Sequence, residues 1–231
     1  MILKPYNELP SQFQNDEVKR YYYILNSKKP ALVFKRVMDI FFSFLLSLIL
    51  LLPMLIIAVC IKLDSNGPVL YKQERVTTYG KKFKIYKFRS MTVGADKAGA
   101  LVTSQNDARI TKTGKFLRKF RLDELPQVFN VLFGDMSIVG TRPEVQKYVD
   151  RYTPSMYATL LMPAGITSLA SIKYKDEDAI IGEVSDPSKV DDVYCNDILP
   201  DKMKFNLEYI EKFGFFSDIK LMFETVKNVF L

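Results

Sequence analysis

Two adjacent carboxylates, Asp123 and Glu124, lie among basic side chains in the segment from Arg118 to Pro126. A carboxylate surrounded by arginine has a lowered pKa and stays ionised beside a place where phosphate would bind. An ionised aspartate can attack phosphorus, and it can also hold Mg²⁺. The alternative is structural, because acids at the start of a helix cap free N–H groups and interact favourably with the helix dipole.

A second motif, Gly140-Thr141-Arg142-Pro143-Glu144, is a turn that contains an arginine. The planar guanidinium of arginine matches two phosphate oxygens at once, so Arg142 is a candidate phosphate ligand. The alternative is a structural ion pair between Arg142 and Glu144 or another acid.

A third motif is the alternating stretch from Phe83 to Met91, which is typical of a half-buried strand. Its alternation places Lys84 and Tyr86 on one face and Lys87 and Arg89 on the other. Either face could present cations to an anionic ligand. The alternative is an ordinary solvated strand face.

The composition narrows the chemistry that these motifs could perform. The chain contains no histidine, which excludes Ser-His relays and histidine metal sites. Its two cysteines, Cys60 and Cys195, do not indicate a disulfide framework. We therefore expect any acid, base or nucleophile to be a carboxylate.

The positive charge is concentrated in one window of the chain. The formal net charge is +7, yet the window from Lys72 to Arg121 contains fourteen basic residues and three acids, a net +11, which leaves −4 elsewhere. From Asp176 to Asp201 the balance reverses, with nine acids against Lys189 alone. Basic clusters bind nucleic acid, acidic lipid headgroups or phosphorylated small molecules. Without a recognisable nucleic-acid module, we expect lipid or phosphorylated ligands and no nucleic acid.

An uncharged run from Ile40 to Ile61 is long enough for a helix that crosses a hydrocarbon core, and Pro53 lies inside it. Basic residues flank both ends, including Lys35 and Arg36 upstream, so both ends are expected at the cytoplasmic face. We predict a re-entrant helix-break-helix over residues 31–62 that bends at the proline. The alternative is a proline-kinked transmembrane helix.

The remaining pattern predicts an α+β fold in which residues 1–30 are an N-terminal extension and residues 63–231 are one further domain with its own core. Two strands, Val69 to Arg75 and Lys82 to Ser90, are expected to form a β-hairpin. Toward the end of the chain, two amphipathic helical patterns flank Gly214, and an interfacial position at the membrane suits them.

The apolar spacing after the acid pair predicts one more helix. It starts at Asp123-Glu124 and continues through Leu125, Val128 and Phe129. Gly134 stands where such a helix would stop.

Taken together and in order, these segments resemble the monotopic phosphoglycosyl transferases, or bacterial sugar transferases. The resemblance covers about Phe34 to Ile172 and resumes over Phe205 to Val229. Its separate motifs are Phe34-Lys35-Arg36-Val37-Met38-Asp39, Gln73-x-Arg75, Tyr86-Lys87-Phe88-Arg89-Ser90-Met91, Leu122-Asp123-Glu124-Leu125-Pro126-Gln127, Phe129-Asn130-Val131-Leu132-x-Gly134-Asp135-Met136-Ser137 and Gly140-x-Arg142-Pro143.

The resemblance implies transfer of sugar 1-phosphate from a UDP-sugar to polyprenyl phosphate, with Mg²⁺, at the cytosolic face of a bacterial inner membrane. By analogy, Asp123 is the nucleophile and a metal ligand, and Glu124 assists. The implied phosphate-binding or substrate-binding residues are Arg118, Arg142, Lys87, Arg89 and Arg75. Two other classes remain open: a membrane-anchored scaffold or regulator without turnover, and a membrane-tethered nucleic-acid binder.

The chain departs from the family pattern at three places. Leu52 replaces a serine before the helix-breaking proline, and Thr77 replaces a glycine in the hairpin. The family's Arg-Pro-Gly-Ile-Thr-Gly segment is Pro163-Ala164-Gly165-Ile166-Thr167-Ser168 here, so its arginine is absent. The loss of this arginine, together with the acidic stretch from Asp176 to Asp201, leaves the donor sugar open.

Overall fold

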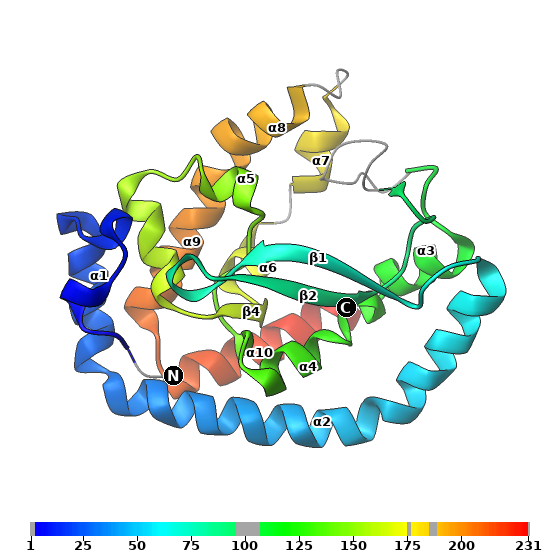
Figure 1. Cartoon of the computed structure of the whole chain (residues 1–231), viewed down its shortest axis with the longest axis horizontal. Coiled ribbons are helices and arrows are strands. Elements are labelled where there is room, and N and C mark those ends of the chain that lie inside the picture. Colours follow the sequence, from blue (N-terminus) through cyan, green and yellow to red (C-terminus); the bar gives the residue numbers. More distant parts are fainter. Residues whose placement is uncertain (1–2, 96–106, 175–176, 185–188, 231) are drawn as a thin grey trace.

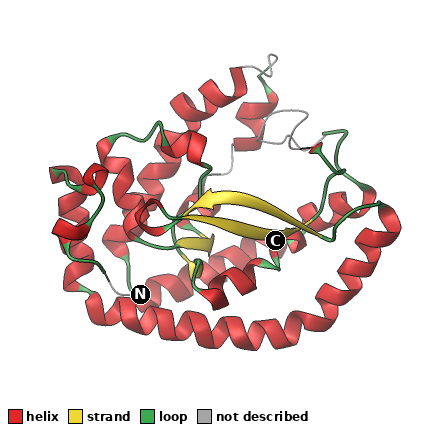
Figure 2. Cartoon of the chain, in the orientation of Figure 1, coloured by secondary structure: helices red, strands yellow, loops and turns green. Residues whose placement is uncertain are grey.

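The apolar run forms one long helix, α2 (Lys29–Asp64), and most of the chain lies within its curve in the computed structural model (Figure 1). The structure describes residues 3–95, 107–174, 177–184 and 189–230. Its other α-helices are α1 (Asp16–Ser27), α3 (Lys112–Lys119), α4 (Gln127–Phe133), α5 (Gln146–Val149), α6 (Leu169–Lys173), α7 (Glu177–Gly182), α8 (Val190–Val193), α9 (Leu199–Lys212) and α10 (Phe215–Phe230). Two two-stranded sheets complete the α+β fold, as the secondary-structure colouring shows (Figure 2).

Helix α2 is continuous through Pro53 and changes direction in its C-terminal half (Figure 1). A proline removes one backbone donor, and the hydrogen bonds on either side hold such a helix together while it bends. The sequence predicted a break at Pro53, whereas the helix runs through this residue without interruption. Only 17% of its most apolar 18-residue window is buried, which distinguishes α2 from the core helix of a soluble protein.

Both ends of α2 are attached to the rest of the domain. Near its start, Lys35 forms a 2.7 Å ion pair with Asp218 of α10. At its end, Asp64 Oδ2 accepts a 2.8 Å hydrogen bond from the backbone N–H of Thr113, in the first turn of α3. Arg89, predicted to bind phosphate, instead donates to the carbonyl oxygen of Ser65 at 2.6 Å and is only 5% exposed. Arg89 thus stabilises the C-terminal end of α2.

The turn after α2 depends on Gly67. Its φ of 126° is unfavourable for other residues, and an added Cβ would lie 2.2 Å from Nη1 of Arg89. We expect Gly67→Ala to lower the free energy of unfolding by about 1–3 kcal/mol, because it adds backbone strain and displaces a buried guanidinium. Thermal unfolding in detergent would measure this loss.

Gly214→Ala is the matched control for Gly67→Ala, because a Cβ at Gly214 would meet no atom within 4 Å. Equal melting temperatures for the two variants would contradict the structural role of Gly67.

The predicted hairpin is confirmed as β1 (Leu70–Val76) and β2 (Lys82–Phe88), paired antiparallel with Arg75 opposite Phe83. One face of β2 buries Phe83 and Ile85. Helix α4 is fastened to its edge by Asn130, which accepts from the Tyr86 amide at 2.9 Å and donates to the Lys84 carbonyl at 2.8 Å. These contacts place α4 beside the strand that carries Lys87.

The second sheet pairs β3 (Met136–Val139) parallel to β4 (Ala164–Thr167). The strands meet where Gly140 and Gly165 approach so closely that a Cβ on Gly165 would lie 2.2 Å from the Gly140 nitrogen. Thr77, the departure in the hairpin turn, is 3% exposed, and its hydroxyl accepts from the Ala164 amide at 3.1 Å. Thr77, which replaces the family's glycine, thus contacts Ala164, which lies in the altered segment from Pro163 to Ser168.

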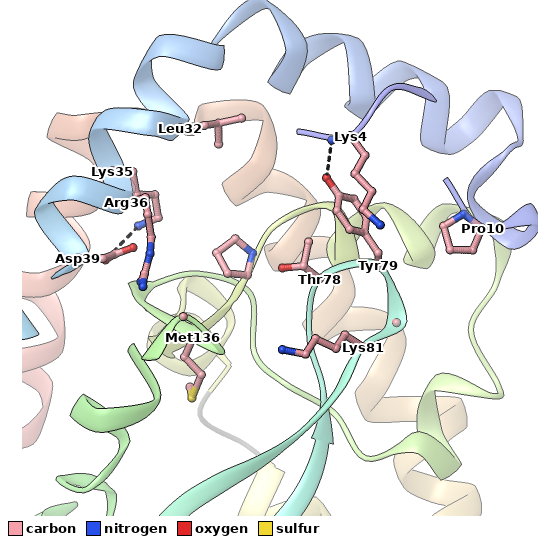
Figure 3. A pocket seen from close by; sticks show the side chains of 13 residues that line it. Lys4, Pro10, Leu32, Lys35, Arg36, Asp39, Thr78, Tyr79, Lys81 and Met136 are labelled. Carbon is pink, nitrogen blue, oxygen red and sulfur yellow. Dashed lines mark hydrogen bonds and ion pairs between the residues drawn. The ribbon is translucent and has the colours of Figure 1, made fainter. Parts of the chain in front are cut away.

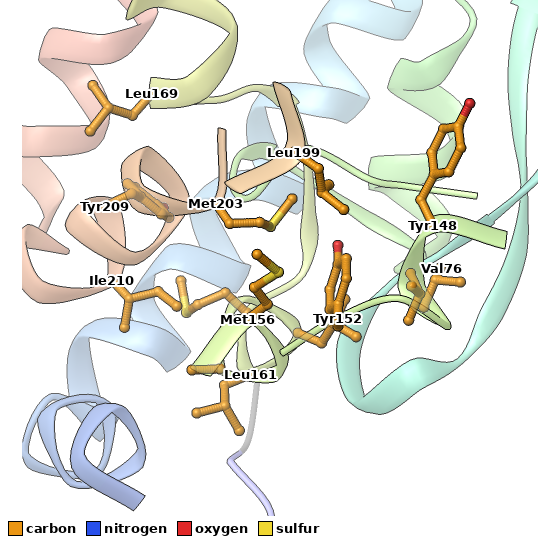
Figure 4. Close-up of a cluster of buried hydrophobic side chains, with 14 of the residues drawn as sticks. Val76, Tyr148, Tyr152, Met156, Leu161, Leu169, Leu199, Met203, Tyr209 and Ile210 are labelled. Carbon is orange, nitrogen blue, oxygen red and sulfur yellow. The ribbon is translucent and has the colours of Figure 1, made fainter. Parts of the chain in front are cut away.

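The N-terminal segment is packed on the domain. Phe13, Val18 and Leu25 are fully buried and belong to the largest core cluster. The same cluster includes Met156, Leu161, Met203 and Tyr209 from later elements (Figure 4). The described residues before position 30 therefore share a core with the rest of the chain.

The acidic stretch contains the two short helices α7 and α8. Asp191 in α8 accepts from the Tyr148 hydroxyl at 2.7 Å, which ties this stretch to α5.

Helices α9 and α10 follow the acidic stretch on either side of Gly214, so the predicted C-terminal pattern is confirmed. Phe216 and Phe223 of α10 are 83% and 73% exposed, as an interfacial helix would require.

Candidate active site

The acid pair lies in a 3₁₀ turn, Leu122–Glu124, between α3 and α4. The prediction that a helix begins at Asp123 is wrong, because α4 begins only at Gln127 after Pro126, which lacks an N–H. The turn opens with Arg121 in the left-handed region at φ 53°. No side chain caps α4, so helix capping does not explain the two acids.

Lys87 faces the acid pair from β2. Its Nζ donates to Oε1 of Glu124 at 2.7 Å, and the two side chains are 26% and 23% exposed. The alternation of β2 predicted that Lys87 lies on the face opposite Lys84, and the structure shows that this face is the one that buries Phe83 and Ile85. A partly buried, charge-assisted hydrogen bond fixes the position of both groups.

The two acids titrate differently. Burial and the neighbouring Glu124 charge raise the pKa of Asp123 to about 6, although Lys87 and Arg118 oppose this rise. Burial also acts to raise the pKa of Glu124, but Lys87, together with Arg142 and Arg121, lowers it to about 2. The predicted lowering therefore holds for Glu124 and is wrong for Asp123. Adjacent carboxylates with separated pKa values are typical of functional sites.

Arg142 reaches the same site from the loop after β3. Its charge lowers the pKa of Glu124, its Nη1 donates to Ser171 Oγ at 3.1 Å, and its backbone N–H donates to Asn206 Oδ1 at 3.3 Å. Ser171 also pairs with Ser168 at 2.8 Å, in the segment where the family pattern is altered. The sequence analysis did not identify Ser171 or Asn206.

The alternative ion pair between Arg142 and Glu144 is not formed. Glu144 is 2% exposed and accepts from the Tyr194 hydroxyl at 2.9 Å, with Lys202 Nζ at 3.5 Å from its other oxygen. Arg75 donates to the Pro143 carbonyl at 3.2 Å. These contacts hold the residues after Arg142 in place, so Arg75 acts on the site through the loop.

Arg118 lies in the last turn of α3, close enough to Asp123 for its charge to act to lower the pKa of that acid. The structure thus brings Asp123, Glu124, Lys87, Arg118 and Arg142 together. It does not bring Arg89 to the acid pair.

Asp123 and Glu124 offer two carboxylates to a metal ion. Among the described residues, no group of three acidic or cysteine side chains could form a complete metal cage. Mg²⁺ is usually held by one or two carboxylates and by substrate phosphates, and it keeps several waters. The acid pair fits that kind of site.

The predicted membrane-flank residues Lys35 and Arg36 line a cavity of about 570 Å³ between α2, the hairpin turn and the N-terminal segment (Figure 3). Arg36 donates to the carbonyl oxygen of Val131 at 2.7 Å and to that of Leu132 at 3.1 Å. These carbonyls end α4, where a cation is favoured by the helix dipole. Lys35 and Arg36 therefore tie α2 to α10 and α4.

The fold and the site define an α+β enzyme with one long apolar helix and an acid pair beside lysine and arginine. The chain belongs to the bacterial sugar transferase family, whose sequence profile matches residues 30–231.

Named relatives agree with this assignment. The chain is 37% identical over 203 residues to the UDP-glucose:undecaprenyl-phosphate glucose-1-phosphate transferase of Klebsiella pneumoniae, covering 87% of this chain and 41% of the relative. It is 38% identical to the UDP-N-acetylgalactosamine-undecaprenyl-phosphate N-acetylgalactosaminephosphotransferase of Aeromonas hydrophila, covering 76% and 38%. It is 37% identical to exopolysaccharide production protein PSS of Rhizobium leguminosarum bv. phaseoli, covering 84% and 94%. The chain thus spans about two fifths of the first two relatives.

Proposed function

We propose that this protein transfers sugar 1-phosphate from a UDP-sugar to polyprenyl (undecaprenyl) phosphate, releasing UMP, as the first membrane step of surface glycan assembly. The observation that carries the proposal is the acid pair Asp123-Glu124 with Lys87, Arg118 and Arg142 around it. The names of the Klebsiella and Aeromonas relatives support the donor and acceptor classes.

In the first step, an oxygen of ionised Asp123 attacks the phosphorus that bears the sugar. The bond between that phosphorus and the oxygen bridging to UMP breaks, and its electron pair leaves with UMP. A phosphoglycosyl-aspartate remains. Lys87 and Arg142 lie where they can stabilise the charge on the phosphoryl oxygens, and Arg118 lies beside the nucleophile.

In the second step, a phosphate oxygen of polyprenyl phosphate attacks the same phosphorus. The bond to the Asp123 oxygen breaks, the carboxylate is restored, and the product is a diphosphate-linked sugar. Two steps through a covalent intermediate divide a difficult transfer between anions into easier halves. Glu124, held ionised by Lys87, orients that lysine toward the phosphates.

Mg²⁺ would be held by Asp123 and Glu124 together with the donor phosphates, and it would neutralise phosphate charge there. Since two carboxylates alone form an incomplete cage, we expect metal affinity to rise when the UDP-sugar is bound. Calorimetric titration of Mg²⁺ with and without the donor would measure that coupling.

We also propose a monotopic attachment in which α2 enters and leaves the cytosolic face of the bacterial inner membrane. The attachment of both helix ends to one domain, through Lys35 and Asp64, supports this topology. Cysteine labelling near the two termini tests it, because termini on opposite faces would rule it out.

The test of the function is UMP release by the purified protein with Mg²⁺ and undecaprenyl phosphate, across a panel of UDP-sugars. Lipid-dependent release with one sugar would establish the reaction and identify the donor. No release with any sugar would favour the non-catalytic scaffold.

The pH dependence of UMP release follows from the acid pair. Asp123 attacks only when ionised, so kcat/KM is expected to fall as pH drops below about 6. Glu124, with a pKa of about 2, stays ionised throughout this range. Assays from about pH 5 to about pH 8 would show kcat/KM decreasing on the acidic side with the slope expected for the binding of one proton. A profile that stays flat through pH 6 would contradict Asp123 as the nucleophile.

A further inference from the structure

An apolar groove of about 340 Å³ lies between the first half of α2 and α10. Its walls include Phe34, Met38 and Phe42 from α2 and Ile219, Met222 and Val226 from α10. Ile138 and Val139 of β3 also line it. This volume is within the range of roughly 300–1,000 Å³ that is typical of ligand sites.

The charged side chains in the groove are already paired with one another. Lys35 Nζ lies 2.7 Å from Asp218 and 4.0 Å from Asp39, and all three residues are less than a tenth exposed. A charged headgroup would have to break this buried network, which is costly. The groove therefore suits a hydrocarbon chain whose polar end lies elsewhere.

One end of the groove points toward the active site. Val139 ends β3, and Arg142 follows three residues later, within about 10 Å of extended chain. A second connection leads the same way, because Thr225, beside Val226 in α10, hydrogen-bonds to Thr167 of β4. Ser168, the next residue after Thr167, pairs with Ser171, which accepts from Arg142.

The opposite end of the groove lies near the start of both helices, where Phe34 packs against Phe215 with ring centroids 5.3 Å apart. The groove also adjoins exposed apolar residues, since Phe223 is 73% exposed and Val226 is 57% exposed. Such a surface beside α2 belongs in lipid. The groove thus has a lipid side and an end directed to Arg142.

We infer that this groove holds the part of the acceptor's isoprenoid chain nearest its phosphate and directs that phosphate toward Arg142 and Asp123. The inference rests on the proposed function. It explains why the two helices enclose an apolar channel beside the strand that leads to Arg142. It also makes Met222 and Met38 determinants of acceptor affinity.

The experiment separates the two half-reactions. Exchange of labelled UMP into the UDP-sugar needs the donor and no acceptor, whereas full turnover needs undecaprenyl phosphate. Met222→Trp fills the groove from α10, and Met38→Trp fills it from α2. We expect both variants to retain exchange and to raise the KM for undecaprenyl phosphate about tenfold, the loss that corresponds to expelling about two buried methylene groups.

Phe216→Trp is the matched control, because Phe216 lies on the same helix, is 83% exposed and does not line the groove. Its acceptor KM should equal that of the wild type. Exchange with an unchanged acceptor KM in both groove variants would overturn the inference. The inference would also be overturned if native mass spectrometry shows that the variants lose a bound phospholipid while their acceptor KM is unchanged.

A wild-type protein that exchanges no UMP would overturn the covalent mechanism, whereas the acceptor KM of the two groove variants in full turnover would still test the groove assignment. Loss of exchange in one groove variant alone would indicate misfolding of that variant, and the other variant then decides. Failure of the covalent mechanism can therefore be distinguished from failure of the groove assignment.

Discussion

Asp123→Asn is expected to reduce UMP release by at least about a thousandfold, as removal of a covalent nucleophile does in other enzymes. The asparagine amide keeps the size of the side chain and its place in the 3₁₀ turn, but it cannot attack phosphorus. UMP release with saturating UDP-sugar and undecaprenyl phosphate measures the loss. Activity within tenfold of the wild type would contradict the proposed nucleophile.

The same variant should not lose stability. The folded-state pKa of Asp123 is raised to about 6, so ionising this carboxylate in the folded protein is unfavourable. This acid therefore costs stability progressively as pH rises from its ordinary pKa through about 6, and the cost persists at neutral pH. Because asparagine carries no charge, Asp123→Asn should melt at a temperature no lower than the wild type at neutral pH.

Asp135→Asn is the matched control for Asp123→Asn. Asp135 is a partly exposed acid that pairs with Lys81 on the surface, at 3.1 Å. Its loss should leave UMP release unchanged, since exposed ion pairs contribute little. Equal losses in Asp135→Asn and Asp123→Asn would mean that activity responds to charge in general and not to the nucleophile.

Lys87→Met is expected to lower kcat/KM by about a hundredfold, because it removes a cation positioned to stabilise phosphate charge in the transition state. It should also change the pH profile. Lys87 lowers the pKa of both Asp123 and Glu124, so its removal raises both values. The acidic limb of kcat/KM should therefore move to higher pH, and a titration of activity against pH measures the shift.

Lys87→Arg keeps the charge and should keep the position of that limb. Lys84→Met is the control for loss of charge, since Lys84 is exposed on the other face of β2. A Lys87→Met variant with the wild-type pH profile would contradict the coupling between Lys87 and the acid pair.

Local patterns predicted much of this fold. The hairpin, the helix end at Gly134 and the two helices around Gly214 each depend on alternation, helical spacing or a glycine, all of which are visible in the chain. The start of α4 was misplaced because Pro126 delays helical hydrogen bonding until Gln127. The acid pair was therefore assigned to a helix when it lies in the turn before one.

The contacts of Arg89 show that strand alternation does not determine which group a side chain binds. Lys87 and Arg89 share a face of the strand, as predicted, but they are two positions apart, which is about 7 Å along the strand. That distance brings Arg89 to the carbonyl groups at the end of α2 and Lys87 to Glu124. A strand pattern assigns the face and cannot assign the partner.

The groups around Arg142 come from distant segments. Ser171 and Asn206 lie 29 and 64 residues further along the chain, so no local spacing connects them to the arginine. One signal was present in α9: Lys202, Asn206 and Tyr209 repeat at helical spacing and place polar groups on a buried face. Polar residues on such a stripe need partners. Tyr209 donates to the Val139 carbonyl of β3, Asn206 accepts from the Arg142 amide in the following loop, and Lys202 donates to the Tyr194 hydroxyl and pairs with Glu144.

The direction of the Asp123 pKa shift required the structure as well. The sequence shows the charges near this acid but not its burial, which outweighs the lysine and arginine here. Lys87 acts on both acids, and together with Arg142 and Arg121 it lowers the pKa of Glu124, to which it donates a direct hydrogen bond.

Mass spectrometry of the intact protein after incubation with Mg²⁺ and its UDP-sugar, without acceptor, tests the central claim most directly. The account predicts a mass gain of one sugar phosphate, located on the peptide that contains Asp123, absent from Asp123→Asn and discharged by undecaprenyl phosphate. An unmodified protein that still releases UMP when undecaprenyl phosphate is added would contradict the covalent aspartate and indicate direct transfer between donor and acceptor.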